Sequence, residues 1–480
     1  MYNAAMPRVP ERYRLAFSVL KVLLVVAIFV GANFKSYELG YRKGSGEIIE
    51  PRRALRLLNP TWSGTFSIQR EDGPNVDFSV FWKTWNILDK NFVPSATSTD
   101  AKTIEARVAG AIDGLVRSYD DPYTVLIAKK DSAAFMERVD AQFEGIGAGL
   151  KEDNGSIVVT GLLPDSPALR AGLKVGDRII AIDDVPTQGQ ALSAVIPHIR
   201  GPKESVVVLT IIPAKTQKEV AMPITRGTIV IPTTATRIFA AARNVVESAA
   251  AKAVAAAAAS LPGPQKDAKI AAAKERAAQI AQQQFFVLQL ASFAKTSVDA
   301  FIVDLKKFSR SNTKNLIIDL RHNPGGYLEV AVDLASYFLP KDTVVVTEKT
   351  GALSIVTEHR SRGYPLLEGS TSTRRIVVLL NHNSASASEI LAGALQDHRV
   401  AKVVGETSFG KGSVQSLIDI GDIGSLKITI ARWYTPSGRN ISHTGITPDV
   451  VVDLKDPKYA SSTDPYMDAA VETLLDDSLW

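Results

Sequence analysis

The segment Asn383-Ser-Ala-Ser-Ala-Ser-Glu-Ile-Leu-Ala-Gly-Ala-Leu395 predicts a buried helix that begins at a serine. Ser386 is followed three residues later by Glu389, which is the pattern of a capping box at a helix N-terminus. Unpaired N–H groups and the helix dipole favour negative charge at such a position. The N–H group of Ala387 is then placed to help hold an oxyanion. The segment therefore predicts a hydroxyl nucleophile at a helix start.

A lysine among glycines follows 25 residues after this serine, in Phe409-Gly-Lys-Gly-Ser-Val-Gln415. A serine needs a base to attack a carbonyl group, and a lysine becomes a base when burial lowers its pKa from about 10.4. In an extended segment, Lys411 and Gln415 share one face because side chains alternate with a period of two. Gln415 is therefore a candidate for orienting the lysine amine by a hydrogen bond.

The residues from Asn383 to Gln415 resemble the active-site region of the C-terminal processing peptidases, also called tail-specific proteases. Members of this family are serine endopeptidases with a Ser–Lys dyad. The resemblance implies Ser386 as the nucleophile, Lys411 as the general base and Gln415 as the residue that positions the lysine. It implies a structural role for Asp397 near the site. It also implies that the reaction needs no metal ion and no organic cofactor.

A second motif consists of a strand and a sharp turn. Leu316-Ile-Ile-Asp-Leu320 is an apolar run of strand type, and Arg321-His-Asn-Pro-Gly-Gly326 follows it. Such a turn exposes backbone N–H groups. In the family that the chain resembles, this turn supplies the other half of the oxyanion hole. The resemblance therefore implies Gly325 or Gly326 as a donor that acts together with Ala387.

Residues 141–213 predict a small, mostly β domain with glycine-rich turns. The order of its short strands and its one small helix resembles that of a PDZ domain. Such domains add a peptide strand to a sheet edge and bind its C-terminal carboxylate through backbone N–H groups. Arg200 is a candidate for relaying the presence of a bound tail to the protease unit. The resemblance implies a carboxylate-binding loop formed by Gly145, Ile146, Gly147, Ala148, Gly149 and Leu150, with Ile146 and Leu150 beside an apolar pocket.

Composition narrows the choice of function. The length of 480 residues is enough for two or three domains. A composition that is 45% hydrophobic and 22% charged is ordinary for a globular protein. The absence of cysteine excludes disulfides and thiolate chemistry. The chain also lacks the His-Glu-x-x-His motif of zinc proteases, which argues against that class of enzyme. The net charge of +5 is concentrated in residues 1–56, so the remaining chain shows no basic surface typical of nucleic-acid binding.

The N-terminal region predicts a membrane segment. The run from Leu15 to Phe34 has the length of one bilayer crossing, with Lys21 close enough to one end to reach the interface. We predict an uncleaved single-pass anchor, and the family resemblance places the catalytic body on the extracytoplasmic side. The alternative is a signal peptide that is cleaved near Val30-Gly-Ala32 and a secreted protein.

Taken together, these features predict an α/β multidomain chain. An Ala-rich stretch at about 238–283, broken by Pro-Gly-Pro, predicts two helices inserted into the protease core. The predicted order is a cytoplasmic tail and transmembrane anchor (1–34), a linker (35–75), an N-terminal helical region (76–138), the PDZ domain (141–213), an α/β Ser–Lys protease core (214–455) and a C-terminal segment (456–480).

The predicted function is that of a membrane-anchored serine endopeptidase that recognises protein C-termini and cleaves nearby peptide bonds. Its expected partners are protein substrates with accessible, apolar C-termini, and the membrane. No nucleic acid is expected as a partner. A homo-oligomer is among the expected states. Two alternatives stay open. One is a hydrolase assisted by His382, His398 or His443. The other is a catalytically silent PDZ adaptor built on a protease fold.

Overall fold

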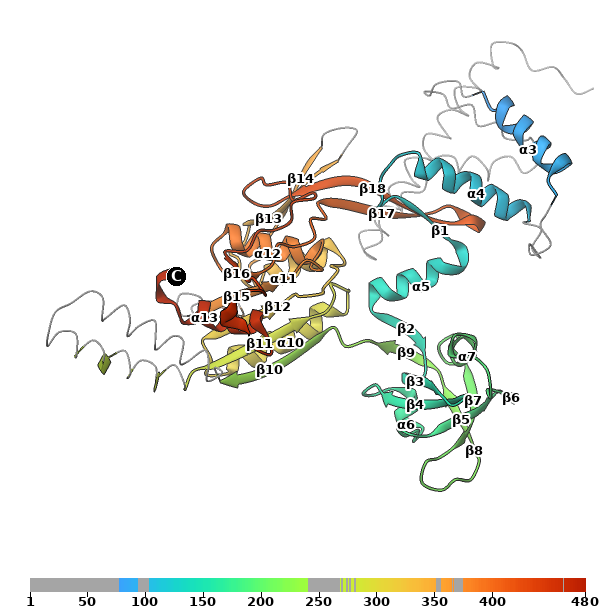
Figure 1. The fold of residues 1–480 in the computed structure, drawn as a ribbon, viewed down its shortest axis with the longest axis horizontal. Coiled ribbons are helices and arrows are strands. Elements are labelled where there is room, and N and C mark those ends of the chain that lie inside the picture. Colours follow the sequence, from blue (N-terminus) through green and yellow to red (C-terminus); the bar gives the residue numbers. More distant parts are fainter. Residues whose placement is uncertain are drawn as a thin grey trace, which may run out of the picture. The chain divides into compact units, whose positions relative to one another are not determined.

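The computed structural model describes most of the second half of the chain and much of the first (Figure 1). The described residues are 77–93, 103–240, 282–350, 355–364, 366, 374–460 and 462–480, together with 268, 271, 272, 275, 278 and 279. The predicted anchor, the linker and most of the Ala-rich insertion lie outside them. Among the helices that are described, none combines the length and the apolar character that a bilayer crossing requires.

The chain divides into two compact units, Met1–Thr99 and Asp100–Trp480. Helix α3 (Ser79–Asn91) is the described part of the first unit, and none of its residues is buried. Its aromatic residues contact one another along one side of the helix, as the helical spacing of Phe81, Trp82 and Trp85 predicts.

A mostly parallel sheet forms the centre of the second unit. Strand β10 runs antiparallel to β11, and every later pair in this sheet is parallel. Apolar runs such as Leu316–Ile318 occupy its middle strands, as expected for a parallel sheet that is covered on both faces. In spatial order the strands are β10 (Thr234–Ala240), β11 (Gln284–Leu290), β12 (Asn315–Asp319), β15 (Arg375–Leu380), β16 (Lys402–Gly405) and β19 (Val450–Val451).

Helices cover both faces of this sheet. On one face, α10 (Ser297–Arg310), α11 (Leu328–Ala335) and α12 (Ala387–Asp397) bury their apolar side chains against alternate strand residues. On the other face, α13 (Pro465–Leu475) packs against the remaining strand residues. The loops that follow β12 and β15 leave the carboxyl ends of neighbouring parallel strands, where α/β sheets bind their ligands. These two loops carry the Gly325-Gly326 turn and Ser386.

The second unit also contains an antiparallel sheet, and Lys411 lies two residues before its strand β17. The long strand β18 pairs with three others, and its register with β17 shifts between Val414 and Gln415. Figure 1 shows β17 and β18 running together along much of their length. The strands are β1 (Val125–Ala128), β18 (Gly424–Tyr434), β13 (Val344–Thr350), β14 (Val356–Arg360) and β17 (Ser413–Asp419).

The region between residues 141 and 230 is rich in strands. Its sheet encloses a separate apolar core that includes Ile157, Ile179 and Leu209. Its helices are α6 (Pro167–Arg170) and α7 (Leu192–Ile199). The sheet comprises β3 (Ala148–Asp153), β4 (Ser156–Leu162), β5 (Arg178–Ile182), β6 (Val185–Pro186), β7 (Val206–Ile212) and β8 (Val220–Thr225), while β2 (Gln142–Gly145) pairs with β9 (Gly227–Val230).

The helical region before this domain differs from the prediction at one place. Helices α4 (Ile104–Arg117) and α5 (Lys129–Asp140) are present, but Val125–Ala128 between them forms strand β1. These four residues pair with residues 424–427 of β18, so a partner far along the chain determines their conformation. Short 3-10 helices complete the described elements: η3 (Gly421–Ile423), η4 (Pro457–Tyr459) and η5 (Asp477–Leu479).

Candidate active site

Ser386 lies at a sharp turn between strand β15 and helix α12. Its backbone has φ 56° and ψ −115°, a left-handed conformation that costs free energy for any residue with a side chain. A strained strand–turn–helix turn of this kind projects a serine hydroxyl away from the backbone. The side chain is half-buried, and Ala387 begins the helix directly after it. The conformation supports Ser386 as the exposed nucleophile of the segment.

The two neighbouring serines have structural contacts instead. The hydroxyl of Ser384 donates to the carbonyl oxygen of Leu320 at 2.9 Å, and that of Ser388 donates to the carbonyl oxygen of Asn323 at 3.0 Å. Both serines are buried. Their hydroxyls therefore hold the serine turn against the end of β12, and Ser386 is the one that remains accessible.

The glycine turn lies directly against Ser386. Gly325 has φ +96°, and a Cβ atom at this position would lie 2.8 Å from both the Cβ of Ser386 and the nitrogen of Ala387. Only glycine fits such a close approach. The N–H of Gly325 already donates to Asn323 Oδ1 at 2.9 Å. Of the two predicted donors in this turn, Gly326 is therefore the better candidate to act with Ala387.

Asn323 fastens the two halves of the predicted oxyanion site to each other. It is 0% exposed, and its side-chain nitrogen donates to the carbonyl oxygen of Leu290 at 2.8 Å. Its own carbonyl oxygen accepts hydrogen bonds from the N–H of Ala385 and from the hydroxyl of Ser388. No role for Asn323 was predicted from the sequence, although an asparagine before Pro-Gly-Gly is a signal for a side-chain-stabilised turn.

The carboxylate of Glu389 connects the serine with the lysine. Its Oε2 atom accepts from the backbone N–H of Ser386 at 2.7 Å and from that of Lys411 at 3.0 Å. Its Oε1 atom accepts from Ser408 Oγ at 2.6 Å and from the N–H of Gly410 at 2.7 Å. Burial raises the pKa of the Glu389 carboxyl, and these four hydrogen bonds oppose that shift. The sequence predicted this residue as a helix cap, but its contact with the lysine loop depends on the fold.

Lys411 lies in an environment that favours a neutral amine. Burial lowers the pKa of Lys411, the positive charge of Lys427 lowers it further, and the negative charge of Glu389 opposes the shift. The carbonyl oxygen of Lys411 is held as well, because Trp433 Nε1 donates to it at 2.9 Å. The direction of the pKa shift is the one that a general base requires near neutral pH.

Gln415 does not make the contact that its spacing predicts. Its side-chain nitrogen donates to Ser413 Oγ at 2.8 Å and, at 3.4 Å, to Thr429 Oγ1. Within the described part of the chain, Gln415 and Lys411 share no hydrogen bond. The register shift between Val414 and Gln415 interrupts the two-residue alternation on which the prediction depended. The positioning role of Gln415 stays a prediction.

Asp397 lies at the C-terminal end of α12 and binds a turn of the following segment. It accepts from the N–H of Ser437 at 2.9 Å and forms an ion pair with Arg439. Burial alone would raise the pKa of Asp397, but hydrogen bonds from Thr435 and Ser437 and the charge of Arg439 together lower it. These contacts are of the structural kind that the resemblance implies for Asp397.

The three histidines of the alternative mechanism have other contacts. His382 is exposed, with Nδ1 at 3.2 Å from Glu406, and His398 Nε2 lies 2.7 Å from the carbonyl oxygen of Val344. The backbone N–H of His443 donates to the carbonyl oxygen of Gly410. In the described ranges none of these histidines hydrogen-bonds to Ser386, and no group of three or more His, Cys, Asp or Glu side chains could hold a metal ion.

The predicted carboxylate loop runs from the end of β2 into β3. Gly147 has φ +76°, and a Cβ atom there would lie 2.5 Å from the Cβ of Ser166. Ile146 is 2% exposed and lies in the core of this domain, so in this structure it lines the core and no open pocket. Leu150 packs against the same core and is partly buried. The remaining members, Gly145, Ala148 and Gly149, provide the backbone of the loop and of the start of β3.

Arg200 connects this domain to helix α5. Its guanidinium forms an ion pair with Glu137 of α5 at 2.6 Å and lies 4.6 Å from the ring centre of Phe143. At the end of the same helix, Asp140 accepts a hydrogen bond from the hydroxyl of Tyr327 at 2.7 Å. Tyr327 directly follows Gly326. Helix α5 therefore contacts both Arg200 and the residue next to a predicted oxyanion donor.

Replacing Glu389 by glutamine is expected to lower the free energy of unfolding by roughly 3–5 kcal/mol, because an amide nitrogen would face N–H or O–H donors inside the protein. The same change would misalign the backbone of Ser386 and Lys411, so cleavage should fall as well. Chemical denaturation and peptide hydrolysis measure the two effects. Glu406→Gln is the matched control, because Glu406 is partly exposed and forms a surface pair worth about 1 kcal/mol or less. Equal stability of the two variants would contradict the role assigned to Glu389.

Comparisons with known proteins identify the family of the chain and its domains. Residues 285–452 match the model of peptidase family S41, and residues 136–212 match that of the PDZ domain. The carboxyl-terminal-processing protease of Picosynechococcus sp. is 30% identical over 407 residues, which cover 84% of this chain and 86% of that protein. The chain belongs to the carboxy-terminal processing serine peptidases of family S41.

Two further comparisons show how far the likeness extends. The carboxy-terminal processing protease CtpB of Bacillus subtilis is 30% identical over 362 residues, which cover 75% of this chain and 65% of that relative, just under two thirds of its length. The solved structure of a photosystem II D1 C-terminal processing protease shares 24% identity, with a TM-score of 0.42, over 83% of this chain and 97% of that one. The two family models and the 30% identical relative that this chain covers to 86% confirm the predicted family and the combination of a PDZ domain with an S41 core.

Proposed function

We propose that this S41 peptidase hydrolyses peptide bonds with Ser386 as the nucleophile and Lys411 as the general base. One observation carries the proposal: the backbone N–H groups of both residues donate to the same oxygen of Glu389. This shared acceptor keeps the two backbones next to each other although 25 residues separate them. The lowered pKa of Lys411 and the left-handed conformation of Ser386 support the same assignment.

The proposed reaction follows from these positions. The neutral amine of Lys411 takes the proton of Ser386 Oγ as this oxygen attacks the substrate carbonyl carbon. The negative charge that develops on the carbonyl oxygen lies at the N-terminus of α12, where the N–H of Ala387 and that of Gly326 stabilise it. Lys411 then returns the proton to the leaving amine, and water hydrolyses the acyl-enzyme. Gln415 would position the lysine, and Asp397 would hold the neighbouring turn.

We further propose that the PDZ domain selects the substrate by its C-terminus. The loop from Gly145 to Leu150 would bind the terminal carboxylate through backbone N–H groups, next to an apolar side-chain site. Arg200 would report the bound tail through Glu137 of α5. Protein substrates with accessible, apolar C-termini are the expected ligands. The domain limits predicted from the sequence, 141–213 for the PDZ domain and 214–455 for the core, belong to this proposal.

The proposal also includes the predicted location of the protein. The apolar run from Leu15 to Phe34 would anchor the protein by a single span, with the catalytic body on the extracytoplasmic side. A secreted form after signal cleavage is the alternative, and a homo-oligomer is an expected assembly. Membrane fractionation of the full chain, compared with a chain lacking residues 1–34, separates an anchored protein from a secreted one.

The test of the proposed function compares one unfolded substrate that ends either in an apolar or in a charged residue. We expect the apolar tail to be cleaved at least about tenfold faster, because one buried apolar side chain is worth about 1.5–3 kcal/mol. Initial rates of hydrolysis measure the difference, with Ser386→Ala as the inactive background. Arg200→Ala should reduce the preference for the apolar tail.

Three results would contradict different parts of this proposal. Equal rates for both tails would remove tail selection by the PDZ domain. An unchanged preference in Arg200→Ala would remove the relay through Arg200 and leave tail binding intact. Binding of the apolar tail without any hydrolysis by the wild-type protein would identify a catalytically silent adaptor.

A further inference from the structure

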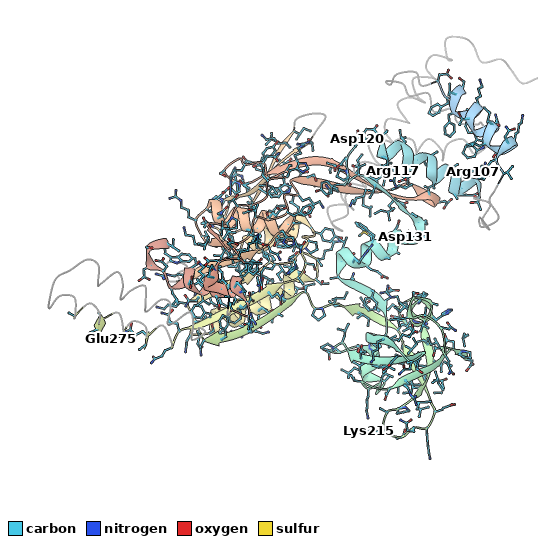
Figure 2. All side chains as sticks on the ribbon, in the orientation of Figure 1. Arg107, Arg117, Asp120, Asp131, Lys215 and Glu275 are labelled. Atoms are coloured by element: carbon cyan, nitrogen blue, oxygen red, sulfur yellow. The ribbon has the colours of Figure 1, made fainter. Side chains whose placement is uncertain are left out.

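The turn between helix α4 and strand β1 reaches the lysine of the dyad. Asp120, labelled in Figure 2, marks the beginning of this turn. Inside the turn, Asp121 accepts from Thr124 Oγ1 at 2.6 Å and from the N–H of Tyr123 at 3.1 Å. Thr124 Oγ1 in turn accepts from the N–H of Thr429 on β18 at 3.0 Å. Hydrogen bonds within the turn, together with the one to β18, therefore fix its position.

This arrangement puts the ring of Tyr123 next to the amine of Lys411. The Nζ atom lies 5.4 Å from the ring centre, within the range of a cation–π contact. Burial raises the pKa of the Tyr123 hydroxyl, and the negative charges of Glu389 and Asp121 raise it further. The hydroxyl is therefore no rival base, and the contact that matters for the lysine is that between the ring and the amine.

The other charged groups around the amine come from different elements. Glu389 faces it from α12 and favours the charged amine, while Lys427 faces it from β18 and disfavours that state. Asp121 partly balances Lys427, because its negative charge opposes the lowering of the Lys427 pKa by burial. Among the residues that the structure describes, Tyr123 is the aromatic residue whose ring lies over the amine.

The ring acts on both protonation states of the amine. As apolar cover it keeps water away from the neutral base, which favours the state that accepts a proton. Its face also attracts the ammonium group that forms when the proton arrives, by about 0.5–2 kcal/mol. A contact that strengthens as charge develops lowers the barrier more than it strengthens substrate binding.

We propose that Tyr123 is a positioning residue for the general base, holding the amine of Lys411 under its ring and excluding water from it. The inference rests on the proposed Ser–Lys mechanism. It adds residues 120–124 to a site whose other parts are the serine turn, the glycine turn and the loop that carries Lys411. It assigns a function to a turn that the sequence analysis did not connect with the site. Two other residues of this turn, Asp121 and Thr124, hold it in place.

The experiment measures Tyr123→Ala by two independent readouts. In the first, the pH profile of kcat/KM should keep its shape, but its acidic limb should move to higher pH, because the entry of water favours the ammonium form more than the loss of the ring's attraction disfavours it. At the plateau, kcat should fall about tenfold while KM changes little. In the second, competitive labelling of the Lys411 amine by an acylating reagent, in the Ser386→Ala background, should show the same shift by mass spectrometry without any turnover.

Two comparison variants isolate the ring. Tyr123→Phe retains the ring and should restore both the acidic limb and most of kcat relative to Tyr123→Ala. Tyr119→Ala removes a tyrosine that is 75% exposed, four residues upstream, and controls for the general effect of such a substitution. Thermal denaturation checks the folding of each variant, and Tyr123→Leu replaces Tyr123→Ala where alanine unfolds the turn. Leucine keeps the bulk but lacks the aromatic face, so kcat should still fall.

The outcomes separate this inference from the proposed mechanism. Labelling and pH profiles of Tyr123→Ala that coincide with those of Tyr119→Ala would overturn the role of Tyr123, while Lys411 would keep its role. Failure of Tyr123→Phe to restore the limb would also overturn it, because the ring alone would then not suffice. Full activity in a chain that lacks the Lys411 amine would instead remove the proposed mechanism itself.

Discussion

Replacement of Ser386 by alanine is expected to abolish peptide hydrolysis, with a loss on the order of 10⁶ in kcat, the scale known for removing the nucleophile of a serine protease. The reason is structural, because Ser386 is the accessible serine of its turn and the N-terminus of α12 begins directly after it. Cleavage of an unfolded protein substrate measures the loss. A fluorophosphonate probe should label the wild-type chain at Ser386 and leave the variant unlabelled.

The neighbouring serines supply the matched controls for this prediction. Ser388→Ala removes one buried hydrogen bond and should cost about 1 kcal/mol of stability, whereas Ser384→Ala also removes the acceptor of the Asn381 N–H and should cost about 2 kcal/mol or more. Both variants should still react with the probe at Ser386. Labelling of the Ser386→Ala variant at another serine, or hydrolysis that survives in it, would show that the nucleophile has been misassigned.

The parts of the site that follow local rules could be predicted from the sequence. The Ser386–Glu389 spacing is a helix-start pattern, and the backbone N–H of Ser386 does donate to the Glu389 carboxylate, at 2.7 Å. The Asn-Pro-Gly-Gly turn has a glycine at position 325, and the absence of a side chain there lets Ser386 lie directly against the turn. Each of these signals depends on a few consecutive residues, which is why the sequence alone could contain them.

The parts that depend on distant pairing could not be predicted in this way. The contact of Tyr123 with Lys411 arises because Thr124 is hydrogen-bonded to Thr429, 305 residues later in the chain. The register shift before Gln415 depends on how β17 pairs with β18, and it invalidates an argument from alternation alone. The second function of Glu389, as an acceptor for the lysine loop, likewise needs the fold.

Replacement of Lys411 by methionine is expected to lower kcat by about 10²–10⁴, the usual contribution of a positioned general base. Methionine has a similar length and carries no charge that must be desolvated on burial, so the variant should retain its stability and its affinity for substrate. Lys411→Arg should be equally impaired, since a guanidinium keeps its proton at every working pH. The split between an impaired kcat and an unchanged KM distinguishes a lost base from a damaged binding site.

The pH dependence gives the sign of the same prediction. Because only the neutral amine accepts the serine proton, kcat/KM of the wild-type enzyme should rise with pH as Lys411 loses its proton. Burial and the charge of Lys427 lower the pKa of Lys411, so this rise should lie below the ordinary lysine value of 10.5. The residual activity of Lys411→Met should not show this rise with pH. A rise with pH that persists unchanged in Lys411→Met would assign the titration to another group and contradict the role of Lys411 as the base.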